Sequence, residues 1–458
     1  MLNLLKNKTS IFLTVVISLL FGWALSLFLP RVSTNEFFVF TIPLILVVVL
    51  LTLMSVRSML VALLFSRVLL DPLFNTTKIS IAGDDIGAGG VINFLIIILA
   101  VFLILRNPKR LSRNNLYKSW IVFLTICGIA IIYSPVTGSA VSLFSNLVSY
   151  MSMAIIPFFV IHSLDDKRFW LKMLFFSSFL PVCYATFDLL RGGTNDIYEG
   201  MRIQGSFTHP NILAFYLVLV IAMTFYVFKS DIFRLSRARR NMLRLYLINL
   251  FVLLLATKTR NAWLSCWVLF FVYGLLKEKK YVIFCIFMPL LLLVHPDSLG
   301  RILNLFTGKS ARYGGRLNSF AWRLKLWRDC LLFMKDKFIF GYGLASFSEY
   351  SYVFSSENLW VRRSFGSHNT YLEFLFGTGI IGLISYIMIF FNVLKSLYSK
   401  VKKAAANLSP GYALVLSYVI SYMIICSADN MERYLVFNWY FWFFIGTVLR
   451  GMQLDEAK

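Results

Sequence analysis

Apolar residues along this chain come in long runs that short polar segments separate, and the pattern continues over most of its length. A helix needs about 20 such residues to cross the roughly 30 Å hydrocarbon core of a bilayer, so the pattern predicts an all-α polytopic membrane protein with about 12 to 14 transmembrane helices. Residues 58–70 form a short run that contains Arg67, and they are interpreted either as a span or as a re-entrant segment. The candidate spans are centred in residues 11–29, 37–54, 58–70, 91–105, 121–133, 149–161, 171–190, 212–228, 245–257, 262–276, 281–294, 371–394, 412–426 and 435–449.

One polar interval, residues 296–367, is long enough to fold outside the membrane. It divides the chain into an N-terminal transmembrane bundle (residues 1–295), this large loop, and C-terminal transmembrane helices (residues 368–458). Inside the loop, apolar residues recur at alternating spacings of three and four, which predicts an amphipathic helix over residues 316–336. Its apolar stripe consists of Leu317, Phe320, Leu324, Trp327, Leu331 and Met334.

Basic residues are distributed unevenly between the two sides of the predicted membrane. Most Lys and Arg residues fall in loops on the side of the N-terminus, and because such loops stay in the cytoplasm, the large loop is expected on the other side. It nevertheless has more than twice as many Lys and Arg residues as Asp and Glu residues, so it is expected to face something anionic. Arg323 borders the apolar stripe, and it either faces a substrate or lies on the bilayer with the helix.

Composition excludes other classes of protein. Hydrophobic residues make up 59% and charged residues 14% of the 458 residues. The net charge of +24 is explained by topology and by attraction to anionic lipid, so nucleic acid is not expected as a partner. Of the six cysteines only Cys330 lies in the large loop, which excludes a disulfide framework there.

A first cationic segment lies just outside the predicted membrane and contains Arg202 and Thr208-His209-Pro210-Asn211. Pro210 suits the first turn of a helix, and Thr208 is a candidate cap. The free N–H groups of such a helix end, together with Arg202, suit a phosphate. The alternative is that Arg202 reaches lipid headgroups at the membrane surface.

Two further outer segments carry charges. Lys258 and Arg260 lie in a turn so short that both must be at the membrane boundary, on the side that the orientation keeps poor in basic residues. Phosphate binding and a structural ion pair both explain them. Asp84 and Asp85 in the 71–90 loop either hold a divalent cation, act as a base, or belong to a solvated loop.

His368 stands where the large loop meets the membrane, directly before the span that starts at Tyr371. Histidine is the side chain best able to take a proton near neutral pH. Of the other histidines, His162 is predicted on the cytoplasmic side, His295 ends a span, and His209 belongs to the first cationic segment. The position of His368 therefore favours a functional role over a structural one.

Four motifs follow one another around the large loop. They are Arg202 with Gly205 and His209-Pro210-Asn211, then Thr259-Arg260-Asn261-Ala262-Trp263, then Trp322-Arg323 with Gly341-Tyr342-Gly343, then Ser367-His368-Asn369-Thr370-Tyr371 with Gly379-Ile380-Ile381-Gly382-Leu383. In this order they resemble the O-antigen ligase and Wzy-type polysaccharide polymerase superfamily, over roughly residues 195–390. One departure is Gly377, where relatives often have Glu, and Glu373 is the nearest substitute.

The resemblance implies a GT-C-like, metal-independent, inverting glycosyltransferase without a cofactor that takes a glycan from an undecaprenyl-diphosphate carrier. Two arginines that match Arg202 and Arg260 would bind the diphosphate, and the histidine that matches His368 would assist the acceptor. Arg323 is assigned to the diphosphate as a third cation, and the supporting residues are Lys258, His209, Asn211, Asn369 and Tyr371.

The first hypothesis is a polymerase that joins lipid-linked repeat units of O-antigen or exopolysaccharide at the periplasmic face of the bacterial inner membrane. The alternative is a ligase that transfers the glycan to lipid A-core. A lipid or polysaccharide transporter is disfavoured, because transporters usually mark residues near mid-membrane, whereas these residues cluster at the outer boundary. The partners are then the lipid-linked oligosaccharide, the glycan acceptor, membrane lipids and a chain-length regulator.

Overall fold

The computed structural model describes residues 55–69, 78–81, 84–111, 114–196, 200–230, 232–293, 319–355, 364–404 and 408–456. They are helical apart from loops and two short antiparallel hairpins, so the predicted all-α class is confirmed. The helices are α3 (Val56–Leu69), α5 (Ala88–Arg106), α6 (Asn115–Ile132), α7 (Thr137–Val160), α8 (Leu164–Ser177), α9 (Phe179–Leu190), α10 (Pro210–Lys229), α11 (Arg237–Ala256), α12 (Arg260–Leu276), α13 (Lys279–Leu293), α15 (Ser319–Phe333), α16 (Phe347–Phe354), α17 (Thr370–Lys403), α18 (Ser409–Ile425) and α19 (Leu435–Glu456). The 3₁₀ turns are η3 (Pro108–Arg110), η5 (Met334–Lys337) and η6 (Met431–Arg433), and the hairpins pair β1 (Lys78–Ile81) with β2 (Asp84–Gly87) and β3 (Thr194–Asp196) with β4 (Gly200–Arg202).

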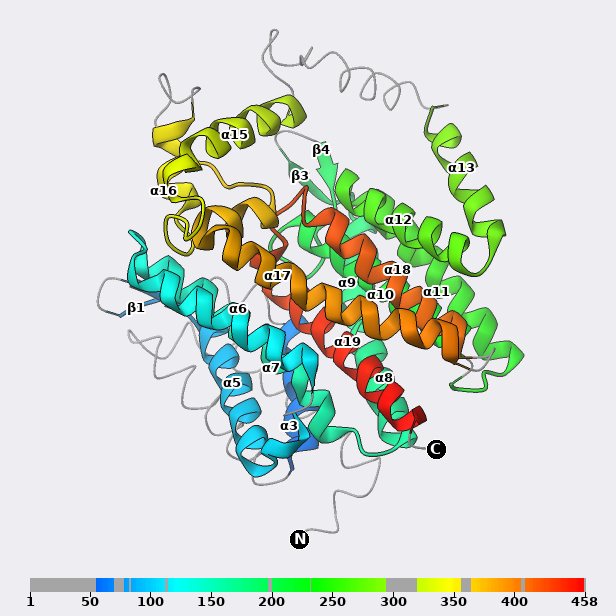
Figure 1. The fold of residues 1–458 in the computed structure, drawn as a ribbon. Coiled ribbons are helices and arrows are strands. Elements are labelled where there is room, and N and C mark those ends of the chain that lie inside the picture. Colours follow the sequence, from blue (N-terminus) through cyan, green and yellow to red (C-terminus); the bar gives the residue numbers. More distant parts are fainter. Residues whose placement is uncertain are drawn as a thin grey trace, which may run out of the picture.

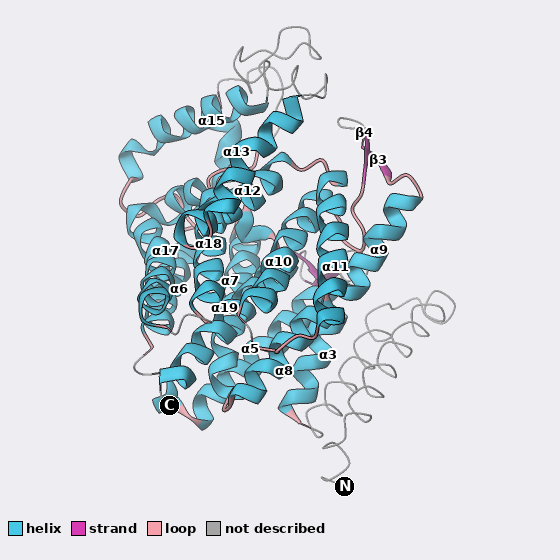
Figure 2. Ribbon diagram, turned by 90° about the vertical axis from the view of Figure 1, so that its right-hand side faces the viewer, coloured by secondary structure: helices cyan, strands magenta, loops and turns pink. Residues whose placement is uncertain are grey.

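The long helices form one bundle with α7, α10, α18 and α19 near its centre (Figure 1). α19 packs along α7, α10 contacts α18 and α19, and α17 lies between α6 and α18. α15 and the β3–β4 hairpin both lie at one end of the bundle, and the end of α19 lies at the opposite one (Figure 2). The end that carries α15 is called the α15 end below.

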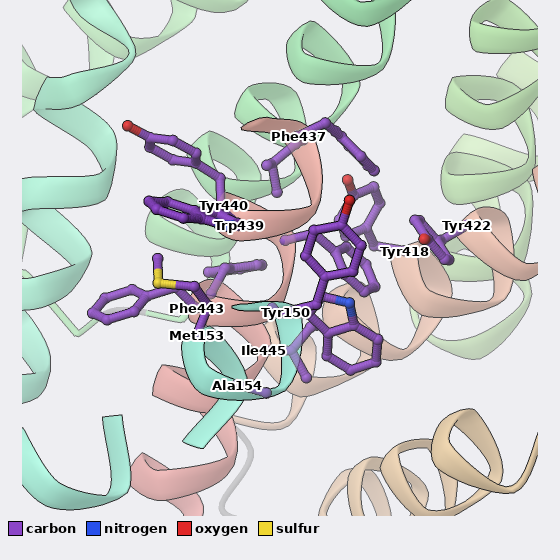
Figure 3. Packing of buried hydrophobic residues seen from close by; sticks show 14 of the residues in the cluster. Tyr150, Met153, Ala154, Tyr418, Tyr422, Phe437, Trp439, Tyr440, Phe443 and Ile445 are labelled. Carbon is purple, nitrogen blue, oxygen red and sulfur yellow. The ribbon is translucent and has the colours of Figure 1, made fainter. Parts of the chain in front are cut away.

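Aromatic side chains fill the centre between α7, α18 and α19 (Figure 3). Tyr422 stacks on Phe441 with ring centroids 4.3 Å apart. Trp439 donates from Nε1 to Ser149 Oγ (2.9 Å). Lipid offers no hydrogen-bonding groups, so a polar atom of this kind needs its partner inside the bundle.

Five helical segments of the described chain are long and apolar enough to cross a membrane. They are Asn115–Ile132, Thr137–Val160, Leu164–Leu190, Pro210–Lys229 and Thr370–Lys403, and shorter apolar helices occupy Ile92–Arg106, Arg260–Leu276 and Ser409–Ile425. The fold is that of a helical membrane protein, but the described residues do not confirm the predicted count of 12 to 14 spans. α11 falls short because its first half contains Arg237, Arg239, Arg240 and Arg244. The predicted spans at 11–29 and 37–54 lie outside the described residues.

α17 is interrupted at Gly379, whose φ of 67° and ψ of −172° are not helical. Residues 338–344, called the strap below, lie against this break. Ile380 N donates to the Phe338 carbonyl (2.9 Å), and Tyr342 N donates to the Phe376 carbonyl (2.8 Å). The strap thereby satisfies backbone groups that the interrupted helix leaves without helical partners, which a membrane protein must do from within.

The predicted amphipathic helix exists as α15 and η5, but the face that packs includes only part of the predicted apolar stripe, namely Met334 and the partly buried Trp327. Leu326, Cys330 and Met334 are buried against an aromatic cluster that contains Phe376 of α17. The stripe residues Phe320, Leu324 and Leu331 are about half exposed instead. Trp327 fixes the rotation of the helix, because its Nε1 donates to the Ser367 carbonyl (2.7 Å); Leu317 lies outside the described residues.

Asp84 and Asp85 stand in a hairpin that precedes α5. They begin β2 and pair with Ile81 and Ser80 of β1, respectively. The sequence offered a cation site, a base or a solvated loop here, and the backbone pairing alone does not distinguish them.

Candidate functional site

The starts of α10 and α12 meet at the α15 end, and Arg202 joins them. Its side chain is buried, with only 6% of its surface exposed. Nε donates to the Thr257 carbonyl (2.8 Å), and Nη2 donates to Thr259 Oγ1 (2.9 Å) and Asn211 Oδ1 (3.1 Å). Arg202 therefore fixes the turn before α12 against the first turn of α10, and it adds a permanent positive charge there.

α10 begins at Pro210 as predicted, but its cap is His209 and not Thr208. The His209 backbone is extended, and its Nδ1 accepts a hydrogen bond from Asn211 N (3.1 Å). The residue immediately before the helix has the better placement for that bond, which explains the difference. The His209 ring is exposed and points an acceptor at the helix start.

Lys258 and Arg260 lie on the turn that Arg202 holds. Lys258 has a φ of 52°, a left-handed conformation that costs a residue other than glycine about 1–3 kcal/mol and persists only where the surroundings impose it. Arg260 is exposed in the first turn of α12. Asn261, next to it, donates from Nδ2 to the Ala428 carbonyl (3.0 Å) and so ties α12 to the α18–α19 connection.

His368 precedes α17 in a similarly strained conformation, with a φ of 48°. Asn369 caps α17, since its Oδ1 accepts from Tyr371 N (3.0 Å) and Leu372 N (3.2 Å). Asn430 holds both neighbours of His368, because its Oδ1 accepts from Ser367 Oγ (2.8 Å) and Asn369 N (3.0 Å). The position of the imidazole is therefore set by the α18–α19 connection.

α15 brings Arg323 and Trp322 to the same place. Arg323 donates from Nη1 to the Ala428 carbonyl (2.9 Å), the oxygen that also accepts from Asn261. The Trp322 ring meets the His368 ring edge to face, with centroids 6.1 Å apart. Arg323 and both neighbours of His368 thus hydrogen-bond to the α18–α19 connection.

Asp429 is the acidic partner of this group. It is buried, and its Oδ1 accepts from Asn430 N (2.9 Å) and Tyr434 OH (3.0 Å). Burial lowers the pKa of His368, the charge of Arg323 lowers it further, and Asp429 opposes both. Burial likewise lowers the pKa of Arg323, with Asp429 opposing and Arg260 adding to the decrease.

The structure brings most of the predicted site residues to one end of the bundle. They are Arg202, His209, Asn211, Lys258, Arg260, Arg323, His368 and Asn369. Tyr371 differs, because its hydroxyl donates to the Met423 carbonyl (2.6 Å) and so ties α17 to α18.

Asp429 and Asn430 were not predicted from the sequence. The signal for them was the polar run Asp429-Asn430-Met431-Glu432-Arg433 between two apolar runs. Among the described residues no group of three or more His, Cys, Asp and Glu side chains could hold a metal ion.

The fold and the site together define a helical membrane protein with a cationic, histidine-containing site at one end of its bundle. Residues 245–387 match the family described as O-antigen ligase, and the predicted resemblance is confirmed over this part of the chain. The match contains Arg260, Arg323 and His368, whereas Arg202 and Asp429 lie outside it. No curated protein matches the chain.

Proposed function

We propose that the protein is a membrane-embedded glycosyltransferase that moves a glycan from an undecaprenyl-diphosphate carrier to a hydroxyl group of an acceptor. The observation that carries the proposal is the electrostatic grouping of His368, Arg323, Arg260 and Asp429 at one end of a helical membrane bundle. The family match supports the same class of reaction.

In the proposed reaction the acceptor hydroxyl oxygen attacks the anomeric carbon of the donor sugar. The bond from that carbon to the diphosphate oxygen breaks and its electrons leave with the diphosphate, while the hydroxyl proton passes to His368. Attack opposite the leaving group inverts the anomeric centre. Fixed guanidinium groups can stabilise the charge that grows on the diphosphate, so the proposed mechanism needs neither a metal nor a cofactor.

His368 has the properties of the general base. Burial and the neighbouring Arg323 lower its pKa, so the imidazole is neutral and able to accept a proton at neutral pH. Once it has taken the proton it is positively charged and faces the buried Asp429, whose negative charge stabilises it. The Asp429 carboxylate thus stabilises the protonated form of His368.

The arginines divide the diphosphate site between them. Arg260 is exposed at the start of α12, where helix N–H groups also point outward, and Arg323 faces it from α15. We assign direct contact with the diphosphate to these two. Arg202 is buried and does not contact the diphosphate in this proposal. It contributes its positive charge and holds the turn that carries Lys258 and Arg260.

The supporting residues have separate parts in this proposal. Lys258 adds charge beside Arg260, and Asn211 links Arg202 to Asp429, to which its Nδ2 donates (3.5 Å). His209 offers an exposed ring at the start of α10. Asn369 holds the start of α17.

Polymerisation of O-antigen or exopolysaccharide repeat units remains the first assignment, and transfer to lipid A-core is the alternative. The distribution of Lys and Arg motivates the inner-membrane location with the site facing the periplasm, and the apolar runs motivate the larger span count of 12 to 14. A chain-length regulator is the protein partner that a polymerase would have.

Purified variants and an undecaprenyl-diphosphate glycan test the assignment. His368→Ala should keep donor binding while turnover falls about 100- to 10,000-fold, the usual range for a lost general base. Arg260→Ala should weaken donor binding and lower the rate about 30- to 1,000-fold, because charge on the leaving group loses a partner. Arg328→Ala is the matched control, since Arg328 is exposed on the same helix as Arg323.

Near-normal transfer by His368→Ala would remove the general base from the proposal. Equal loss of donor binding in His368→Ala and Arg260→Ala would show that the histidine belongs to the diphosphate site instead.

A further inference from the structure

A buried group of charges lies beside the site and has no role in the reaction described above. Glu373 of α17 and Glu432 of η6 are each 2% exposed. Arg433 donates from Nη2 to Glu373 Oε1 (3.0 Å), and its Nε is 3.5 Å from Glu432 Oε1. One guanidinium therefore serves two buried carboxyl groups, which leaves one negative charge uncompensated if both are ionised.

The hydrogen bonds of Thr370 decide which carboxyl group carries a proton. Thr370 Oγ1 accepts from Met431 N (2.9 Å) and lies 3.0 Å from the Asp429 carbonyl and 2.7 Å from Glu432 Oε2. A hydroxyl has a single proton, and the Asp429 carbonyl can only accept. If Glu432 were ionised, two acceptors would compete for that proton, and one short oxygen–oxygen contact would have no hydrogen between its atoms.

A neutral Glu432 resolves this competition. Its own O–H donates to Thr370 Oγ1, and the Thr370 O–H then donates to the Asp429 carbonyl. Thr370 is two residues after His368, and the Asp429 carbonyl is the backbone carbonyl of the residue whose carboxylate faces His368. The chain of bonds from Glu432 therefore ends on the two segments that carry the proposed base and its acidic partner.

We propose that Glu432 is held as a neutral carboxylic acid that positions His368 against Asp429 through the Thr370 hydroxyl. This inference rests on the proposed function where it concerns transfer, and on the structure alone where it concerns the proton. Glu432 touches neither His368 nor the Asp429 carboxylate by a hydrogen bond among the described residues, so it is a positioning residue.

The surroundings of Glu432 favour the neutral acid. The pKa of Glu432 is raised to about 8: burial contributes most, the charge of Glu373 adds to the increase, and Arg433 and the Thr370 hydrogen bond oppose it. The other titratable groups near it are Tyr386 of α17, Tyr434 after η6, Tyr150 of α7, and Tyr422 and Cys426 at the end of α18. Arg67 of α3 interacts electrostatically with the same Tyr150.

The direction of the pH effect follows from that shift. The folded protein binds the Glu432 proton more tightly than the unfolded chain does, so this group's contribution to stability is complete at low pH and is lost as the pH rises toward 8. The rate of glycan transfer should also fall as the pH rises toward 8, because ionised Glu432 competes for the Thr370 proton. The acidic limb of the pH–rate profile belongs to His368, and the alkaline limb belongs to Glu432.

Glu432→Gln tests the proposal, because an amide can donate to Thr370 and cannot ionise. At pH 6 the variant and the wild type should have similar melting temperatures. From pH 6 to pH 9 the melting temperature of the wild type should fall, so that at pH 9 the variant should melt about 3 °C or more above the wild type. In the transfer assay it should lose the alkaline limb and keep the acidic one. Glu432→Ala and Thr370→Val should lose about 10-fold or more activity at pH 7, whereas Thr370→Ser should keep it.

Asp455→Asn is the matched control, since Asp455 pairs with the buried Lys167 at the other end of α19 (3.7 Å). It should leave the alkaline limb of the rate profile unchanged. The proposal is overturned if wild-type melting shows no fall above pH 6, or if Glu432→Gln keeps the wild-type alkaline limb or loses as much activity as Glu432→Ala. The melting measurement needs no glycan donor. If no variant and no wild-type protein transferred a glycan, the proposed function would be contradicted, and the melting profiles alone would test whether Glu432 carries a proton.

Discussion

At the scale of single residues, Asp429 gives the site its balance of charge. It is buried, it opposes the pKa decrease of both His368 and Arg323, and its backbone is fixed by Thr370. Without it, His368 and Arg323 would have no carboxylate among the groups that set their pKa values. The site therefore needs this carboxylate to accommodate a protonated histidine beside permanent cations.

Asp429→Asn should separate this effect from simple loss of structure. Asp429 raises the pKa of His368, so its neutralisation should lower that pKa and move the acidic limb of the pH–rate profile to lower pH, by about one unit at most. Turnover should fall about 10-fold or more, because the protonated imidazole loses its counter-charge. Asp336→Asn is the control, because Asp336 is exposed, and it should leave the acidic limb unchanged. If Asp429→Asn also left the acidic limb unchanged, the assignment of Asp429 as the acidic partner of His368 would be contradicted.

His368, Arg260 and Arg323 could be predicted from the sequence because they contrast with their surroundings: positive charge is unusual on the outer side, and histidines are few. Asp429 offers no such contrast, because a carboxylate in an outer loop is ordinary. Its role depends on Arg323 and His368, which are distant in sequence and adjacent only in the fold. Arg202 was predicted as a cation, but its burial could not be.

At the scale of elements, the break in α17 governs how the site is presented. The half of α17 before Gly379 starts at the His368 segment, and the strap holds it in place through the Phe376 carbonyl. Apolar runs predict where helices lie, because burial and lipid demand them over many residues. They do not predict the break, which depends on a strap from another part of the chain, nor the rotation of α15, which depends on Trp327.

Gly379→Ala should destabilise the protein by about 1–3 kcal/mol, because the left-handed φ is strained for alanine and the added Cβ would overlap the Ile339 carbonyl oxygen. Thermal or denaturant unfolding measures this. Gly128→Ala on α6 is the matched control: its Cβ would lie 3.8 Å from the Phe144 ring, an ordinary contact. Equal stability of the two variants would show that the strap does not constrain α17.

At the scale of the whole molecule, the candidate site lies toward one end of the bundle. The candidate site occupies the α15 end, whereas Lys167 and Asp455 pair near the opposite end, where α19 finishes (Figure 1). The sequence predicts, from the distribution of Lys and Arg, that the large loop containing α15 lies outside the cytoplasm. It did not predict which helices meet, because α7 and α19, which pack along each other, lie at distant positions in the chain.

The proposed orientation can be measured with reporters fused at positions on either side of the membrane. A reporter after Lys309 in the large loop should read as periplasmic, and reporters after Arg239 at the start of α11 and after Lys403 at the end of α17 should read as cytoplasmic. The physical reason is that basic segments such as 237–244 and 400–403 resist transfer across the membrane. The reporter after Lys403 is the internal control, because α17 is long and apolar enough to cross a membrane and should separate it from His368. The reverse pattern would set His368, Arg260 and Arg323 in the cytoplasm, where the proposed reaction on a periplasmic donor could not take place.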